Sequence, residues 1–339
     1  MKKEAILNIK QLLQSPKKMV IVPHKNPDGD AIGSTLGLYH YLKMHNQEAI
    51  IIAPNDYPDF LKWMPGENTI LKYDVETGKC NDLISDADVI FTLDFNALNR
   101  TGDMELVLKS SSALKIMIDH HQQPDDYAAY MYSDVTMSST CEMVYNFITM
   151  LDDKNLINQD IATCLYTGIM TDTGSFRFAS TTSETHRVTA FLIDKGAQPA
   201  KIHNAVMDAN SFDRMQLLGC ALTNLKVIPE SKTAYITLSQ DELNTYNYKK
   251  GDTEGFVNYA LSLQNIIFAV IFIEDKQNNI IKMSFRSKGD FSVNEFARAH
   301  FEGGGHTNAA GGKSNLSLPE TVEKFISILP AYNNALKNE

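Results

Sequence analysis

The feature that most constrains the fold is a regular alternation of short apolar runs and helical patterns in the first half of the chain. The apolar runs occupy residues 19–22, 49–53, 89–93 and 114–118. After the first run, Ile32, Leu36 and Tyr39 recur at helical spacing. Such alternation is typical of a parallel sheet with helices on both faces. The sequence therefore predicts an α/β fold for this half of the chain.

Ligand-type side chains follow these runs, at the strand ends where parallel sheets bind their ligands. The stretch HKNPDGDAIGS after the first run leads from a strand into a helix and contains His24, Asp28 and Asp30 within seven residues. Carboxylates this close repel each other unless a positive charge lies between them. Asp30 alone would be interpreted as a helix cap. Together with His24 and Asp28, it indicates a metal site.

Further candidates follow later runs. Asp94 ends FTLD, and Asp119, His120 and His121 follow KIMI, while Asp172 closes the second helix after Ser138. Many carboxylates, few imidazoles and no thiolate suit Mn²⁺, Mg²⁺ or Co²⁺ better than structural zinc. The set is large enough for two ions, and two ions about 3.5 to 4 Å apart can share a hydroxide that attacks phosphorus. The pattern predicts phosphoester hydrolysis.

The character of the sequence changes after about Leu225, where strand runs such as AYITLS, IIFAVIFIE and IIKMSF mix with helical patterns. We expect a catalytic domain at 1–195, a helical connection at 196–225 and a smaller mixed domain at 226–339. Arg286 and Ser287 end one of these runs, and Arg286 offers a bidentate grip on a phosphate. The glycines of the GGGH run, which is followed by TNAAGG, would let the backbone approach a ligand closely. The candidate substrate residues are Arg286, Ser287, Gly303, Gly304, Gly305 and His306.

Taken in order, HKNPDGD, FTLDFN, IDHH and GIMTDTG resemble the four motifs of the DHH phosphoesterase family. The stretch FRSKGDFSVNEFARAHFEGGGHTNAAGG is similar to the DHH-associated domain, so the resemblance covers essentially the whole chain. The members that it resembles most are bifunctional oligoribonucleases and phosphatases of 3′-phosphoadenosine 5′-phosphate (pAp). The resemblance implies two α/β domains with a cleft between them.

Carried over residue by residue, the resemblance implies two ions bridged by Asp94 and Asp172. One ion would be held by His24, Asp28, Asp94 and Asp172, and the other by Asp30, Asp94, His120 and Asp172. Asp119 would hold the ring of His120, and His121 would face the substrate phosphate, as a donor to it or as the acid for the leaving oxygen. Arg286 and the GGGH loop would hold the nucleotide. The family commonly has a glycine where Glu302 stands, and a carboxylate there would weaken the binding of a polyanion.

The implied activity is Mn²⁺-dependent hydrolysis of short RNA to nucleoside 5′-monophosphates, and of pAp to AMP. The acidic chain offers no basic track for a longer strand, so we expect substrates of about two to five nucleotides. A phosphodiesterase acting on cyclic di-AMP or linear pApA remains an alternative, since it has the same two domains. From a different class, a nucleotide-binding regulator that has lost catalysis would have an incomplete ligand set, and here no position is missing.

Composition restricts partners and compartment. The net charge of −10 argues against long duplex nucleic acid as a partner. The four cysteines form no CxxC pair, which fits a reducing cytoplasm. No signal-peptide core is expected at the N-terminus, and the longest apolar run, 266–273, is far shorter than the roughly 20 residues of a membrane span. The sequence does not decide whether the chain forms a homodimer.

Overall fold

The computed structural model describes residues 1–337. The chain forms two compact units, Met1–Ala209 and Asn210–Glu339, and the division falls within the stretch expected to connect the domains. Helix α8 (Pro199–Val206) lies in the first unit and α9 (Phe212–Thr223) in the second. No helix among the described residues is long and apolar enough to cross a membrane.

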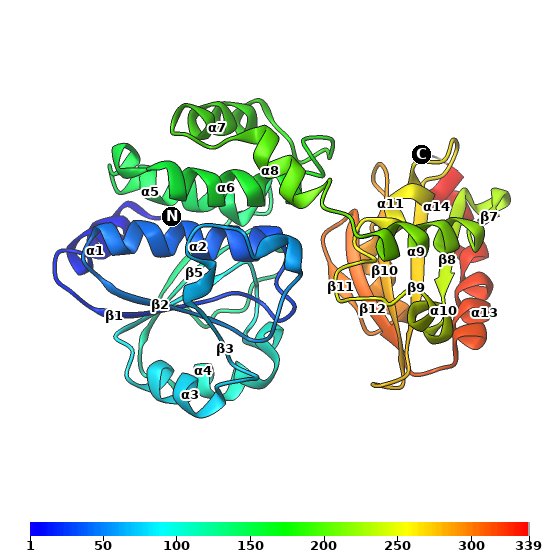
Figure 1. The fold of residues 1–339 in the computed structure, drawn as a ribbon, viewed down its shortest axis with the longest axis horizontal. Helices are drawn as coiled ribbons and strands as arrows, with labels where there is room; N and C mark the ends of the chain where they lie inside the picture. Colours follow the sequence, from blue (N-terminus) through cyan, green and yellow to red (C-terminus); the bar gives the residue numbers. More distant parts are fainter. Residues whose placement is uncertain (338–339) are drawn as a thin grey trace. The chain divides into compact units, whose positions relative to one another are not determined.

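The first unit contains a six-stranded parallel sheet with the strand order β3-β2-β1-β4-β5-β6 (Figure 1). Its strands are β1 (Lys18–Val22), β2 (Glu48–Ala53), β3 (Ile70–Lys72), β4 (Val89–Leu93), β5 (Leu114–Asp119) and β6 (Tyr130–Ser133). The four expected strands are confirmed. The two edge strands, β3 and β6, were not predicted from the sequence, and they have only three and four residues.

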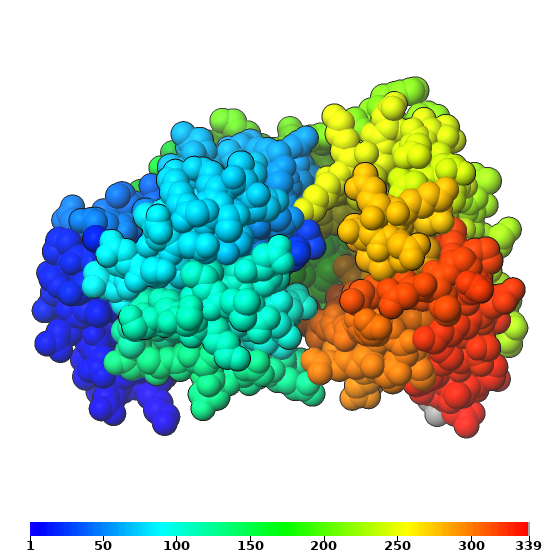
Figure 2. Space-filling model, turned by 90° about the horizontal axis from the view of Figure 1, so that it is seen from below, coloured from blue at the N-terminus to red at the C-terminus, as the bar shows by residue number. Residues whose placement is uncertain are grey.

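Helices cover both faces of this sheet, and successive side chains of β1 pack alternately on the two faces. Met19 and Ile21 pack in one core with α2 and α6, whereas Val20 and Val22 pack in another with α3 and α4. Figure 1 shows the two layers, and Figure 2, which views the molecule from below, shows the cyan and teal surface that includes α3 and α4. The helices are α1 (Lys3–Leu12), α2 (Gly29–Met44), α3 (Thr77–Ser85), α4 (Glu105–Ser110), α5 (Thr140–Met150), α6 (Gln159–Asp172) and α7 (Ser183–Asp194).

Helices α2 and α6 pack closely because each has a glycine where it contacts the other helix. A Cβ on Gly33 of α2 would lie 2.6 Å from the carbonyl oxygen of Cys164 on α6, and one on Gly168 of α6 would lie 2.9 Å from a carboxylate oxygen of Asp30 on α2. Neither distance is possible for a real side chain, so only glycine permits this approach. The contact brings the end of α6, at Asp172, beside the start of α2.

The second unit has a six-stranded mixed sheet with the order β11-β12-β10-β9-β8-β7, in which only the β8–β9 pair is parallel. Its strands are β7 (Lys226–Ile228), β8 (Thr233–Leu238), β9 (Phe268–Asp275), β10 (Ile280–Ser287), β11 (Gly304–Gly305) and β12 (Ala309–Ser314). The helices besides α9 are α10 (Gln240–Thr245), α11 (Phe256–Leu261), α12 (Val293–His300), α13 (Leu318–Ile328) and α14 (Asn333–Lys337). A phenylalanine-rich core that includes Phe268, Phe285 and Phe296 lies under α12 and α13.

Candidate metal centre

The eight predicted ligand-type residues of the first unit lie at the carboxyl ends of three neighbouring strands and at two helix ends. His24 follows β1, Asp94 follows β4, and Asp119 ends β5, directly before His120 and His121. Asp28 and Asp30 lie at the start of α2, and Asp172 is the last residue of α6. Asp94 has a φ of 66°, a left-handed conformation that Asp tolerates better than most residues. Such conformations cluster at functional sites.

Asp28 caps helix α2, so the cap that Asp30 alone would suggest lies two residues earlier. One Asp28 carboxylate oxygen accepts the backbone N–H groups of Asp30 and Ala31, both at 3.1 Å. Asp30 is already helical, and its side chain is almost completely buried. Spacing alone did not reveal which of two aspartates, two residues apart, adopts the extended backbone that a cap needs.

Two of the compact groups that the ligand atoms form have different members. In one group, His24, Asp28 and Asp94 bring their ligand atoms within 4.8 Å of one another, and in the other Asp30, His120 and Asp172 do the same. Asp94 borders both groups: one carboxylate oxygen lies 3.4 Å from Nε2 of His24 and the other lies 3.6 Å from Nε2 of His120. The two oxygens of the Asp94 carboxylate therefore face different groups, and its role as a bridge between two ions stays a prediction.

The histidine rings are oriented by their second nitrogens. Nδ1 of His24 lies 2.9 Å from the carbonyl oxygen of Lys25, and Nδ1 of His120 lies 3.1 Å from that of Met137. Each Nδ1 therefore carries the proton, which leaves Nε2 on the side of the carboxylates. The Asp119 carboxylate instead accepts from Nδ1 of His121, at 2.7 Å. The prediction that Asp119 holds His120 is wrong: both nitrogens of His120 are directed elsewhere, to Met137 and to the carboxylate group.

The electrostatics of the site show an excess of negative charge. Burial, followed by repulsion from Asp30 and Asp28, holds the pKa of Asp94 well above its usual range. Although burial lowers the pKa of His120, Asp172 and the other carboxylates raise it to about 9. Burial and the charge of His120 hold the pKa of His121 well below its usual range. The cluster thus lacks positive charge, and its oxygen and imidazole donors fit divalent cations.

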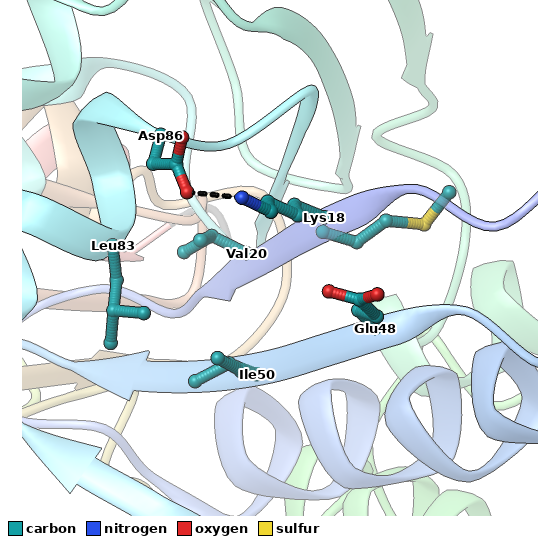
Figure 3. Close-up of a pocket in the computed structure, with 7 residues that line it drawn as sticks. Lys18, Val20, Glu48, Ile50, Leu83 and Asp86 are labelled. Atoms are coloured by element: carbon teal, nitrogen blue, oxygen red, sulfur yellow. Dashed lines mark hydrogen bonds and ion pairs between the residues drawn. The ribbon is translucent and has the colours of Figure 1, made fainter.

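A surface hollow at the amino ends of β1 and β2 is unrelated to these groups (Figure 3). It is lined by Lys18, Met19, Val20, Glu48, Ile50, Leu83 and Asp86. The ammonium group of Lys18 pairs with Asp86, as the dashed line in Figure 3 marks. Because His24 lies beyond the carboxyl end of β1, the hollow lies at the opposite end of the strands from the ligand groups.

In the second unit, the GGGH loop packs against β12. A Cβ on Gly303 would lie 2.1 Å from the carbonyl oxygen of Gly311, and one on Gly305 would lie 2.5 Å from that of Ala309. Gly304 and Gly305 form β11, whose N–H at Gly305 donates to the buried side chain of Asn294. Chain packing therefore requires glycine at 303 and 305, and the close approach of a ligand to this loop stays a prediction.

Arg286 is the second-last residue of β10 and lies opposite Ala309 of β12. The Ser287 hydroxyl is buried, donates to the carbonyl oxygen of Phe291 at 2.6 Å and accepts from Asn308 at 2.9 Å. The Ser287 side chain therefore fixes the loop after β10, and a contact between Ser287 and the substrate stays a prediction. Glu302 has a φ of 43°, which explains why glycine suits its position, and its carboxylate pairs with Lys313 at 3.2 Å.

Two residues that touch or influence the metal groups were missed in the sequence. The Thr140 hydroxyl donates to Asp94 at 2.9 Å. The spacing of Ser139 and Glu142 is typical of a helix start and could have placed Thr140 at a helix N-terminus. It could not have indicated that Asp94 is the partner of Thr140. Arg100 follows β4, and its charge contributes to the low pKa of His121. Nothing in the local sequence indicates that contribution, which depends on how β4 and β5 lie together.

Comparisons with known proteins agree with this geometry. The DHH family, N-terminal domain, matches residues 18–169, and the DHHA1 domain matches residues 232–335. The bifunctional oligoribonuclease and PAP phosphatase NrnA of Thermus thermophilus is 30% identical over 90% of this chain and 87% of its own length. The cyclic-di-AMP phosphodiesterase GdpP of Bacillus subtilis is 25% identical over 96% of this chain, but over only 49% of its own length.

A solved structure matches both units together. The crystal structure of an exopolyphosphatase-related protein from Bacteroides fragilis superposes with a TM-score of 0.94 at 41% identity, over 99% of this chain and 98% of that one. The two α/β domains predicted from the sequence are thereby confirmed.

Proposed function

This chain belongs to the DHH phosphoesterase family, and we propose that it hydrolyses short oligoribonucleotides to nucleoside 5′-monophosphates and pAp to AMP. The observation that carries the proposal is the pair of His/Asp groups that share Asp94 at the carboxyl edge of the parallel sheet. The similarity to an oligoribonuclease and PAP phosphatase over most of both chains supports the choice of substrates.

We infer two Mn²⁺ ions, with Mg²⁺ or Co²⁺ as substitutes. His24, Asp28 and Asp94 would hold one ion, and Asp30, His120 and Asp172 the other, with Asp94 and Asp172 shared between them. When bound, the two ions would activate water and neutralise the charge that develops on a phosphoryl group under attack. The backbone carbonyls that accept from Nδ1 of His24 and His120 keep the two Nε2 atoms available as ligands.

His121 would act on the substrate rather than on the ions. Its Nδ1–H donates to Asp119, and its low pKa leaves Nε2 without a proton in the free protein. An arriving phosphate brings negative charge beside the ring, which raises the pKa and favours a proton on Nε2. The ring would then donate to the phosphate or to the departing ribose oxygen, while Asp119 holds its orientation. In the second unit, Arg286 and His306 would bind the nucleotide.

The match to GdpP over nearly the whole chain favours a second candidate, hydrolysis of cyclic or linear di-AMP. The two candidates differ in substrate and share the metal groups, so a parallel assay separates them. A 5′-phosphorylated diribonucleotide, pAp, cyclic di-AMP and a 24-nucleotide RNA would each be incubated with the Mn²⁺-loaded protein, and products separated by chromatography.

We expect the dinucleotide and pAp to be hydrolysed at least about tenfold more efficiently than cyclic di-AMP, a difference of about 1.4 kcal/mol in transition-state binding. The 24-nucleotide RNA should be a poor substrate. Hydrolysis of the short substrates should depend only weakly on salt, because the site contacts few phosphates. A preference for cyclic di-AMP would establish the second candidate instead. Tight Mn²⁺ binding without turnover of any substrate would point to a nucleotide-binding regulator, and Asp172→Asn serves as the inactive control.

A further inference from the structure

Helix α5 begins directly against the metal groups. The backbone N–H groups of Thr140 and Cys141, the first two residues of the helix, donate to the two carboxylate oxygens of Asp30 at 2.6 and 2.8 Å. These groups would otherwise lack partners, because the first turn of a helix has no preceding carbonyls. The helix start therefore fixes the plane of the buried Asp30 carboxylate.

The side chain of Thr140 reaches the other metal group. Its hydroxyl donates to one oxygen of Asp94 at 2.9 Å, and that oxygen is the one facing His120. The second oxygen of Asp94 faces His24. One residue thus contacts a carboxylate of each group, Asp30 through its backbone and Asp94 through its hydroxyl, and sets the rotation in which each Asp94 oxygen faces a different group.

The start of α5 is itself held rigidly. Ser139 caps the helix by accepting the N–H of Glu142 at 3.0 Å. The buried carboxylate of Glu142 accepts from the Ser138 hydroxyl and, at 3.0 Å, from the hydroxyl of Thr185 on α7. All of these side chains are buried, so Thr140 has little freedom to move away from Asp94.

We propose that Thr140 is a positioning residue that holds the Asp94 carboxylate in its bridging orientation between two metal positions. The proposal rests on the two-ion site of the proposed function. It assigns Thr140 no contact with substrate or ions: the hydroxyl acts through Asp94. Partners of this kind usually contribute about 10- to 100-fold to metal affinity or activity.

The test compares Thr140→Val, which removes the hydroxyl and keeps the shape, with Thr140→Ser, which keeps the hydroxyl. Each metal-free protein would be titrated with Mn²⁺ by calorimetry, and the spin coupling between the two bound ions recorded by electron paramagnetic resonance. We expect Thr140→Val to bind the second Mn²⁺ about 10- to 100-fold more weakly and to lose much of the coupling. Thr140→Ser should retain both properties.

Wild-type affinity and coupling in Thr140→Val would overturn the proposal, as would an equal loss in Thr140→Ser. Thermal unfolding in chelator checks that the valine variant is folded; if it is not, Thr140→Ala is compared with Thr140→Ser under the same two criteria. Failure of the wild-type protein to bind two Mn²⁺ ions would contradict the proposed function itself. Normal binding by the wild type and by Thr140→Val contradicts only the role of Thr140.

Discussion

The two units treat buried or half-buried carboxylates in opposite ways. In the first unit, Asp94 is buried near Asp30 and Asp28, and its pKa lies well above the usual range. In the second unit, hydrogen bonds from Lys282 and Asn278 outweigh burial and lower the pKa of Asp275 to about 2. The second unit neutralises its carboxylate with its own side chains. The first leaves a deficit of positive charge that a cation can fill.

The two sheets also differ in whether they bring together residues that are distant or close in the sequence. A parallel sheet brings the ends of β1, β4 and β5 to one edge, so residues distant in sequence meet there and their charges accumulate. In the second unit, the antiparallel pair β9–β10 places Asp275 opposite Ile280, near Lys282 on the same hairpin. Local pairing stabilises the hairpin, whereas convergence of distant carboxylates costs stability and gains a metal site.

The largest effect that would sharpen this comparison is expected for Asp94→Asn. Loss of the shared carboxylate should reduce turnover by at least about 10³-fold. It should also stabilise the metal-free protein by about 1 kcal/mol, because a crowded, buried charge is removed. Turnover assays and thermal unfolding in chelator measure the two effects. Asp275→Asn is the matched control and should lower stability; a destabilised Asp94→Asn would break the comparison.

A smaller effect is expected for Arg286→Ala. Loss of a charged hydrogen-bond donor to phosphate should raise the KM for dinucleotides about 10- to 100-fold, or about 1.5 to 3 kcal/mol. Bound Mn²⁺, measured by elemental analysis, should stay unchanged, because the proposed ligands all lie in the first unit. Arg187→Ala, which removes an exposed arginine on α7, should leave both quantities unchanged. Loss of metal from Arg286→Ala would contradict the division of roles.

The pH dependence of stability tests the paired carboxylate. A pKa lowered to about 2 means that Asp275 contributes stability above its unfolded pKa, about 4, and that this contribution disappears as the pH falls towards 2. Lys282→Met should cost about 1 kcal/mol at pH 7. Urea unfolding at several pH values should show the difference from the wild type shrinking below pH 4; a constant difference would mean that the ion pair is not its source.

The smallest effect concerns Glu302. Glycine removes the strain of a left-handed backbone but also the exposed pair with Lys313, so Glu302→Gly should change stability by less than about 1 kcal/mol. Glu302→Ala loses the pair and keeps the strain, and should be the less stable of the two. Because Lys313 offsets the charge of the Glu302 carboxylate, we expect both variants to have the same KM as the wild type. A clear fall in KM in either variant would support the prediction that this carboxylate repels the substrate.

Much of the first unit could be predicted from the sequence because its information is local. Buried parallel strands are continuous apolar runs, so β1 and β4 are readable from composition. Asp94 directly follows one of these runs, and Asp172 ends a helical pattern. Strands β3 and β6 lack the length that would distinguish them from loops.

Contacts between segments could not be predicted in this way. Whether Asp119 holds His120 or His121 depends on side-chain direction at the end of β5, which the order of residues does not encode. The contact between Thr140 and Asp94 depends on where α5 starts relative to β4. The role of Ser287 depends on a loop that closes through Asn308. In each case the partner of the side chain is set by the tertiary structure, and Thr140 was not identified from the sequence at all.

The order of the ligands along the chain has a consequence for biosynthesis. His24 and Asp94 follow the adjacent strands β1 and β4, but the group with Asp30 and His120 is complete only when α6 supplies Asp172. Chains grow from the N-terminus and fold domain by domain during synthesis. In a ribosome-bound chain the group with Asp30 and His120 therefore stays incomplete until Asp172 has been added, and we expect this group to bind a cation later than the group of His24, Asp28 and Asp94.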